Sequence, residues 1–233
     1  MKENSIHICF VVDESGSMYS SQSDVIGGFR KVIDEQRAVK DGSCIVSLFK
    51  FENRVTEVYR GKEVKDVPYL DEKSYCPGGG TAMNDAIGTA IDSTVKWVNG
   101  LKESERPEKH LFVIMTDGME NSSREYNGHQ IREMIKKHED EDHWTFMYLG
   151  ADITDAEAAV DLGINYRGFA AKGDLQDVYC CVSSLATDFR NTSGSTETKY
   201  ATFTASLDAE LNTMNTHYEK KLGRKIANND KKA

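Results

Sequence analysis

The residues best suited to chemistry in this chain of 233 residues lie in one short segment after an apolar run. Residues 6–12 are mostly apolar and rich in β-branched side chains, which is typical of a buried parallel strand. Asp13, Ser15 and Ser17 follow at alternating positions, and Gly16 permits a tight turn between the serines. One carboxylate and two hydroxyls are hard oxygen donors, so the segment suits a divalent cation that keeps several waters.

Two later segments carry similar donors. Thr81 follows the glycines 78–80, and Asp117 follows the uniformly apolar residues 111–115. In an open parallel sheet, ligands bind outside the carboxyl ends of the strands, near the point where the strand order reverses. The strands that end in Asp13 and Asp117 would flank this point. We therefore expect the three polar clusters to meet there, with the glycines allowing Thr81 to come close.

Hydrophobic periodicity predicts strands that alternate with helices along most of the chain. The expected strands are residues 6–12, 44–51, 55–59 continuing toward 64, 111–115, 144–149 and 165–169, and the expected helices are 23–37, 84–99, 129–139, 152–162 and 175–190. A reversal at Asn53-Arg54 predicts a hairpin and hence an antiparallel edge strand. The fold class expected is α/β, a doubly wound, mostly parallel sheet with one antiparallel edge strand flanked by helices.

The composition changes near residue 190. We expect a domain over residues 1–190, followed over residues 191–233 by a C-terminal segment that is partly helical or disordered. Within it, residues 191–198 are rich in Ser and Thr and are predicted as a linker. A weakly amphipathic stretch at 207–222 is a candidate helix, and the last ten or so residues are predicted to be disordered.

Charge and cysteine usage exclude several classes of protein. The net charge of −9 argues against a nucleic-acid-binding surface, and no apolar run approaches the roughly 20 residues of a membrane span. The first residues lead directly into a strand without the apolar region of a signal peptide. The five cysteines show no paired spacing, and Cys9 and Cys44 are expected to be buried thiols. We therefore expect a cytoplasmic protein that contacts neither nucleic acid nor membrane.

Three motifs, in this order, resemble the von Willebrand factor type A domain. They are D-x-S-G-S at residues 13–17, G-G-T at 79–81 and T-D-G at 116–118. The resemblance covers roughly residues 5–190 and fills all five positions of the family's metal-ion-dependent adhesion site. It implies a Rossmann-like fold, in agreement with the pattern of strands and helices.

The resemblance also implies a ligand set. Ser15, Ser17 and Thr81 would supply hydroxyl ligands to Mg²⁺, and Asp13 and Asp117 would act mainly through coordinated water. Mn²⁺ or Ca²⁺ are the alternative ions. A protein partner would complete the coordination with the carboxylate of an Asp or Glu. Because the site has only two carboxylates, an incoming anion gains strong electrostatic attraction from the ion.

Later segments narrow the resemblance to a subgroup of the family. Residues 117–121, 149–152 and 162–164 are similar to small stand-alone type A proteins of bacteria and their phages. The chain differs from the extracellular adhesion receptors, which carry signal peptides and disulfides. It also lacks the ATPase motifs of the larger chelatase-type relatives.

Two other functions stay open at this point, a Mg²⁺-dependent hydrolase or phosphotransferase and a scaffold that contacts its partner through the C-terminal segment. An aspartyl-phosphate mechanism would need an Asp where Ser15 stands. The serine-hydrolase motif G-x-S-x-G would need a glycine where Asp13 stands. We therefore expect a non-enzymatic module for protein–protein interaction, with no catalytic residue.

Neighbouring residues have more ordinary interpretations. Ser17 and Thr81 precede helices, so either could instead cap one. Glu14 is expected to be a solvated loop charge, and Asp85 is expected to bind backbone amides at the start of its helix. Tyr19 and the tyrosine at position 75 are candidates for the rim of the site, although Tyr75 could equally pack beneath the loop.

Overall fold

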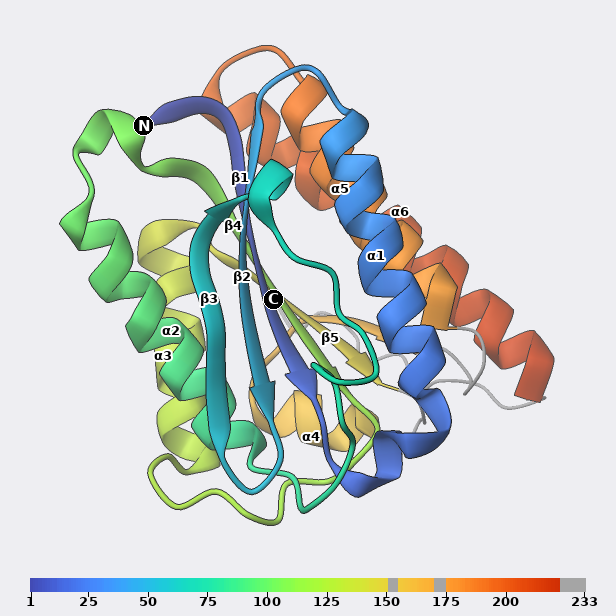
Figure 1. Ribbon diagram of the computed structural model, residues 1–233. Coiled ribbons are helices and arrows are strands. Elements are labelled where there is room, and N and C mark those ends of the chain that lie inside the picture. Colours follow the sequence, from blue (N-terminus) through green and yellow to red (C-terminus); the bar gives the residue numbers. More distant parts are fainter. Residues whose placement is uncertain (151–154, 170–174, 223–233) are drawn as a thin grey trace.

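A computed structural model describes residues 1–150, 155–169 and 175–222 of the chain. Six strands form one sheet in the order β3-β2-β1-β4-β5-β6, with helices on both faces (Figure 1). The strands are β1 (Lys2–Asp13), β2 (Ser43–Phe51), β3 (Val55–Glu63), β4 (Pro107–Thr116), β5 (Thr145–Gly150) and β6 (Tyr166–Phe169). Strand order reverses between β1 and β4, which pair in parallel, so their carboxyl ends flank the point where ligands bind in such sheets.

One strand runs against the others. β3 pairs with β2 in antiparallel fashion through the hairpin at residues 52–54, while every other pair of neighbours is parallel. The expected fold class is confirmed: a doubly wound, mostly parallel sheet with one antiparallel edge strand.

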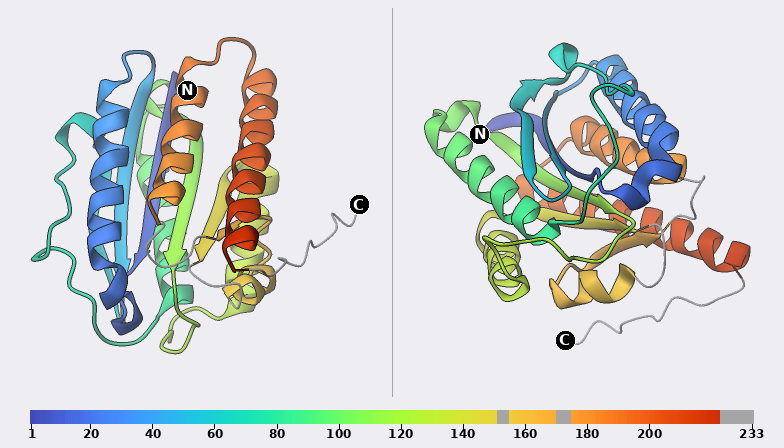
Figure 2. Two further views of the ribbon diagram at one scale, coloured as in Figure 1. Left: turned by 90° about the vertical axis from the view of Figure 1, so that its right-hand side faces the viewer. Right: turned by 60° about the horizontal axis from the view of Figure 1, so that its bottom comes forward.

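Helices form a layer on each face of the sheet, and Figure 2 shows the two layers from the side and from below. The helices are α1 (Gln22–Ala38), α2 (Met83–Gly100), α3 (Gly128–Asp142), α4 (Asp155–Asp161), α5 (Leu175–Asn191) and α6 (Thr196–Leu222), with 3₁₀ turns η1 (Gly16–Ser21), η2 (Val64–Asp66) and η3 (Glu103–Glu105). α1, α5 and α6 pack on one face, and α2, α3 and α4 pack on the other. The predicted start of α4 at residue 152 lies outside the described residues.

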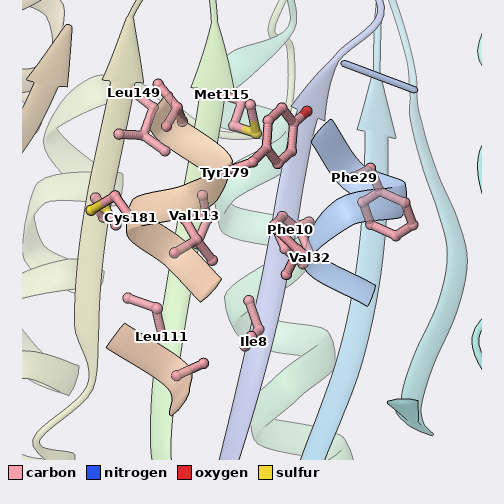
Figure 3. Close-up of a cluster of buried hydrophobic side chains, with 14 of the residues drawn as sticks. Ile8, Phe10, Phe29, Val32, Leu111, Val113, Met115, Leu149, Tyr179 and Cys181 are labelled. Atoms are coloured by element: carbon pink, nitrogen blue, oxygen red, sulfur yellow. The ribbon is translucent and has the colours of Figure 1, made fainter. Parts of the chain in front are cut away.

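Successive residues of β1 feed two separate cores, because side chains alternate across a strand. Ile8 and Phe10 face α1 and α5, whereas Cys9 and Val11 face α2 and α3. Figure 3 shows the first core, where the ring of Phe10 lies beside α1. Burial on both faces explains why the central strands read as continuous apolar runs rather than alternating ones.

The chain after residue 190 returns to the sheet. α6 begins at Thr196 and runs alongside α5 and β6. Its inward side is apolar and buried, formed by Phe203, Leu207, Leu211, Met214 and Tyr218. The stretch predicted as a linker is thus a short connection between two packed helices. The residues predicted to be disordered at the end of the chain lie almost wholly beyond the described residues.

Two polar contacts fasten α6 to the sheet. Lys199 is 2 % exposed, and its Nζ lies 3.1 Å from Glu108 Oε2 at the amino end of β4. Near the other end of the helix, Asn215 Oδ1 accepts a hydrogen bond from Phe169 N and its Nδ2 donates to Arg167 O, both at 3.0 Å. The Asn215 amide therefore pairs with the β6 backbone where a further strand would otherwise pair.

A membrane span is not among the described elements. Across residues 1–150, 155–169 and 175–222, no helix combines the length and the apolar character that crossing a bilayer requires. All five cysteines are free thiols, and Cys9 and Cys44 are buried as expected.

Candidate metal centre

The centre of the site is Asp13, the last residue of β1, which is fully buried. Its Oδ1 accepts a hydrogen bond from Ser15 N at 2.7 Å, and its Oδ2 accepts one from Thr116 Oγ1 at 2.6 Å. Burial raises the pKa of Asp13; these hydrogen bonds lower it, and the nearby charge of Asp117 raises it again. Two carboxylates thus lie close together at the reversal point of the sheet, an arrangement that a divalent cation would stabilise.

The two serines follow on the loop into η1. Ser15 is buried, Ser17 is exposed, and their hydroxyl oxygens lie 2.9 Å apart. Ser17 lies inside the 3₁₀ turn, and Ser15 at its N-cap makes no side-chain capping bond. The capping interpretation of Ser17 therefore finds no support here, and both oxygens remain near the Asp13 carboxylate.

Gly118 shows where the three clusters meet. A β-carbon at this position would lie 3.1 Å from Thr81 Oγ1, 3.5 Å from Ser17 Oγ and 3.7 Å from Asp13 Oδ2. Oxygen donors from three loops far apart in the sequence thus surround one point at the carboxyl end of the sheet. Any larger residue at position 118 would crowd the oxygens, so glycine keeps this space open.

The glycine-rich loop before Thr81 is pressed against the turn that follows β1. Gly16 N lies 3.3 Å from Gly79 O, and Gly78 N donates to Glu14 O at 2.8 Å. Gly79 has a φ of +74°, which side chains with a β-carbon rarely adopt. The loop can therefore bring Thr81 to the Asp13 cluster, as the glycines predict.

The loop after β4 is held by hydrogen bonds to the start of α2. Asn121 Oδ1 accepts from Thr81 N at 2.9 Å, and Asn121 N donates to Thr81 O at 3.1 Å. Glu120 accepts hydrogen bonds from the backbone N–H groups of Asn84, Ser122 and Ser123. These bonds fix the position of Thr81 relative to Asp117.

Asp85 has a structural role, though a different one from the expected cap on its own helix. Its carboxylate accepts three hydrogen bonds, from Arg124 N, Glu125 N and Tyr126 N, at 2.8 to 2.9 Å. It therefore organises the loop after β4 from across the site. Sequence spacing could not show this, because the partners lie about 40 residues away.

Glu14 differs from the expected solvated charge. Its side chain is 13 % exposed and lies 2.8 Å from Lys50 Nζ, and Oε1 also accepts from Cys76 N at 2.6 Å. The carboxylate stabilises the loop that leads to the glycines. It points away from the oxygen cluster because alternate residues of the segment face opposite sides.

Tyr75 and Tyr19 take different positions. Tyr75 is fully buried, and its hydroxyl donates to Asp13 O at 2.6 Å, so it packs beneath the loop. Tyr19 lies on η1 and is 74 % exposed, in agreement with a place on the rim. The positioning role of Thr116 was missed from the sequence, although it stands in the T-D-G motif directly before Asp117.

The donor set consists of oxygen atoms only. Five side chains, Asp13, Ser15, Ser17, Thr81 and Asp117, supply two carboxylates and three hydroxyls from three loops. Within the described residues, no group of three or more His, Cys, Asp or Glu side chains could hold a metal ion. A metal centre here must use the hydroxyls, and this set suits hard cations such as Mg²⁺, Mn²⁺ or Ca²⁺.

Comparisons with known proteins agree with this architecture. The family model of the von Willebrand factor type A domain matches residues 7–165. No curated protein matches the chain.

Solved structures resemble the fold at low sequence identity. One is proximal thread matrix protein 1 from the mussel byssus with a zinc-occupied MIDAS motif (TM-score 0.53, 13 % identity, 81 % of this chain and 48 % of that chain). Others are manganese-loaded TRAP of Plasmodium vivax (0.50, 17 %, 74 % and 71 %) and the vWF domain of the pilus tip protein Mfa5 from Porphyromonas gingivalis (0.58, 9 %, 82 % and 98 %). The match spans about half the length of the mussel protein, and at these identities the likeness shows the fold alone.

Proposed function

Since this chain belongs to the von Willebrand factor type A domain family, we propose that it is a non-enzymatic interaction module that binds one Mg²⁺. Ser15, Ser17 and Thr81 would hold the ion directly, and Asp13 and Asp117 would act mainly through bound water. An acidic residue of a protein partner would complete the coordination.

The observation that carries this proposal is the convergence of oxygens beside Gly118. Atoms of Thr81, Ser17 and Asp13 lie 3.1 to 3.7 Å from one point, although their loops are separated by many residues. Hydroxyl and carboxylate oxygens are the ligands of hard divalent cations. The ion would supply a strong positive charge at the end of the sheet, where a partner's carboxylate is attracted.

The relatives support a divalent ion without selecting one. The mussel protein has zinc in its MIDAS motif, and the Plasmodium vivax protein is loaded with manganese. We choose Mg²⁺ because three neutral hydroxyls and two carboxylates leave room for waters, which Mg²⁺ retains. A cytoplasmic location, and kinship with the stand-alone proteins of bacteria and phages, belong to the same proposal.

Calorimetric titration of the chain with Mg²⁺, Mn²⁺ and Ca²⁺ tests the metal site. We expect close to one ion per chain, and loss of binding in Asp13→Ala. The matched control is Glu14→Gln, because Glu14 is the next residue but bonds to Lys50 and Cys76 instead. Unchanged binding in Asp13→Ala, or none in the wild-type chain, would contradict the proposal.

A second assay tests the partner and the absence of catalysis. Peptides or proteins that are retained in Mg²⁺ and released by EDTA should lose binding when their acidic residue is replaced by its amide. The wild-type chain should show no metal-dependent turnover of generic phosphate esters. Turnover that Asp13→Ala abolishes would favour the hydrolase alternative.

A further inference from the structure

Two large apolar side chains stand in solvent beside the oxygen cluster. Tyr19 is 74 % exposed and Met119 is 69 % exposed, the highest values of any large apolar side chain in the described part of the chain. Neither residue makes a hydrogen bond or a ring contact that would hold its side chain against the described remainder of the protein. Exposed apolar side chains of this size beside a binding site are typical of protein interfaces.

Both side chains belong to the rim of the same site. Tyr19 comes two residues after Ser17, and Met119 comes directly after Gly118. Ser17 Oγ would lie 3.5 Å from a β-carbon on Gly118, and neighbouring Cα atoms are about 3.8 Å apart. The two apolar side chains therefore start within a few ångströms of the donor oxygens, on two different loops.

The local structure keeps these side chains outside. On η1, the residue before Tyr19 is Met18, which is 2 % exposed and anchors the turn in the core. On the loop after β4, Glu120 and Asn121 bond to backbone groups at the start of α2. With its neighbours fixed on both loops, each apolar side chain is presented to solvent by a held backbone, so little order has to be created when a partner binds.

The opposite rim offers no comparable selectivity. A hollow of about 770 Å³ lies beside the glycine loop and is lined by Glu52, Asn53, Arg54, Val55, Asp85, Thr89, Arg124 and Glu125. Its charges are of both signs, so it favours neither an acidic nor a basic ligand. The apolar rim is the more specific feature.

We propose that the partner is a protein segment whose metal-binding Asp or Glu is flanked by large apolar side chains that cover Tyr19 and Met119. This inference rests on the proposed metal-dependent function and narrows its partner. The carboxylate meets the positive ion, and the apolar neighbours remove the two exposed side chains from water. Aromatic and Met side chains are enriched at such interfaces.

A phage-displayed library of random dodecapeptides tests this directly. Peptides are bound to the full-length chain in Mg²⁺ and eluted with EDTA. We expect an acidic residue to be enriched, with Leu, Ile, Met, Phe or Trp enriched within about three positions of it. The same selection on the variant Tyr19→Ser/Met119→Ser should keep the acidic residue and lose the apolar enrichment.

The best selected peptide then gives a quantitative test. It should bind Tyr19→Ser/Met119→Ser about tenfold more weakly than the wild-type chain or more. The matched control is Val58→Ser, which removes an exposed apolar side chain from β3 and should leave the affinity unchanged. Calorimetric Mg²⁺ affinity of the double variant separates a lost apolar contact from damage to the metal site.

The failures are distinguishable. Acidic peptides without apolar neighbours would overturn this inference and leave the metal-dependent function intact. Apolar peptides that EDTA does not release would also overturn it, because the rim would then bind independently of the ion. A selection with no acidic, EDTA-released peptides would contradict the proposed function itself.

Discussion

The two ends of strands β1 and β4 use polar residues in opposite ways. At the amino end, His7 Nδ1 and His110 Nδ1 lie 2.9 Å apart, and His7 Nε2 lies 2.8 Å from Ser47 Oγ. Lys199 and Glu108 form a buried ion pair nearby. These polar groups meet one another inside the protein, so the amino end is closed.

At the carboxyl end, oxygens from three loops gather around one point near solvent. The carboxylates that are not donors to this point, Glu120 and Asp85, bind backbone N–H groups and shape the loops. Buried polar groups in one sheet can thus stabilise the fold at one end and assemble a binding site at the other. Strand direction decides which end does which, because loops at the carboxyl ends lead into the helices that border the site.

The largest expected effect comes from opening the closed end. Lys199→Met removes the cation that pairs with Glu108, leaving a carboxylate that is 7 % exposed without its partner. Chemical denaturation should show a loss of about 3–5 kcal/mol in the free energy of unfolding. Lys2→Met is the matched control: it breaks a pair with Glu63 whose side chains are 41 % and 44 % exposed, and should cost less than about 1 kcal/mol.

If Lys199→Met/Glu108→Leu recovers most of the lost stability, the cost arises from the unpaired charge. If both single-site variants, Lys199→Met and Lys2→Met, cost the same, the amino end is not closed in the sense argued above.

At the carboxyl end, the corresponding test is addition of metal. An ion that binds only the folded chain should raise the free energy of unfolding by about 2.7 kcal/mol at a concentration of 100 Kd. Asp13→Ala should remove this increase, whereas Glu14→Gln should keep it. Denaturation curves with Mg²⁺ and with EDTA measure the difference, and equal stabilisation of Asp13→Ala would place the ion elsewhere.

Acid should weaken the amino end through its histidines. Burial lowers the pKa of His7 to about 3, and burial, with the nearby charges of His7, Lys109 and His138, lowers that of His110 well below its usual value. The unfolded chain therefore binds more protons, and stability is lost as the pH falls from about 6.5 toward the folded values. Each histidine contributes up to about 1.4 kcal/mol per pH unit in this window.

The variant His110→Gln should reduce this pH slope of the unfolding free energy by about that amount between pH values of roughly 4 and 6. His217→Gln replaces an exposed histidine on α6 and should leave the slope unchanged. An unchanged slope in His110→Gln would contradict the buried, neutral histidine pair.

The smallest effect is expected at the edge of the sheet. Asn215→Ala removes two hydrogen bonds to the β6 backbone, at Arg167 O and Phe169 N, which water can partly replace. We expect a loss of about 1 kcal/mol in the free energy of unfolding. Asn212→Ala, on the exposed side of the same helix, is the control and should change stability by less than about 0.5 kcal/mol.

Much of this architecture is predictable because its signals are local. Apolar runs and helical spacing identified β1, α2 and β4 to within a few residues, and the reversal at residues 52–54 identified the antiparallel edge. The convergence of the Asp13, Thr81 and Asp117 segments followed from a general rule for parallel sheets. Whether these residues hold a metal remains a prediction.

The unpredicted contacts join residues far apart in the chain. Glu14 bonds to Lys50, Asp85 reaches the loop after β4, and Thr116 bonds to Asp13. Nothing in the local spacing distinguishes these side chains from solvated ones. The docking of α6 was equally hidden, since its inward apolar side becomes meaningful only once β5 and β6 are in place.

The Asn215 contact also bears on how the chain can be divided. A fragment ending at residue 190, the predicted domain boundary, would lack α6 and leave Arg167 O and Phe169 N bare on an outer strand. Such a strand is a template for pairing with the strands of other molecules. A shortened protein would therefore be expected to self-associate, and α6 acts as a guard that keeps each copy of the sheet separate.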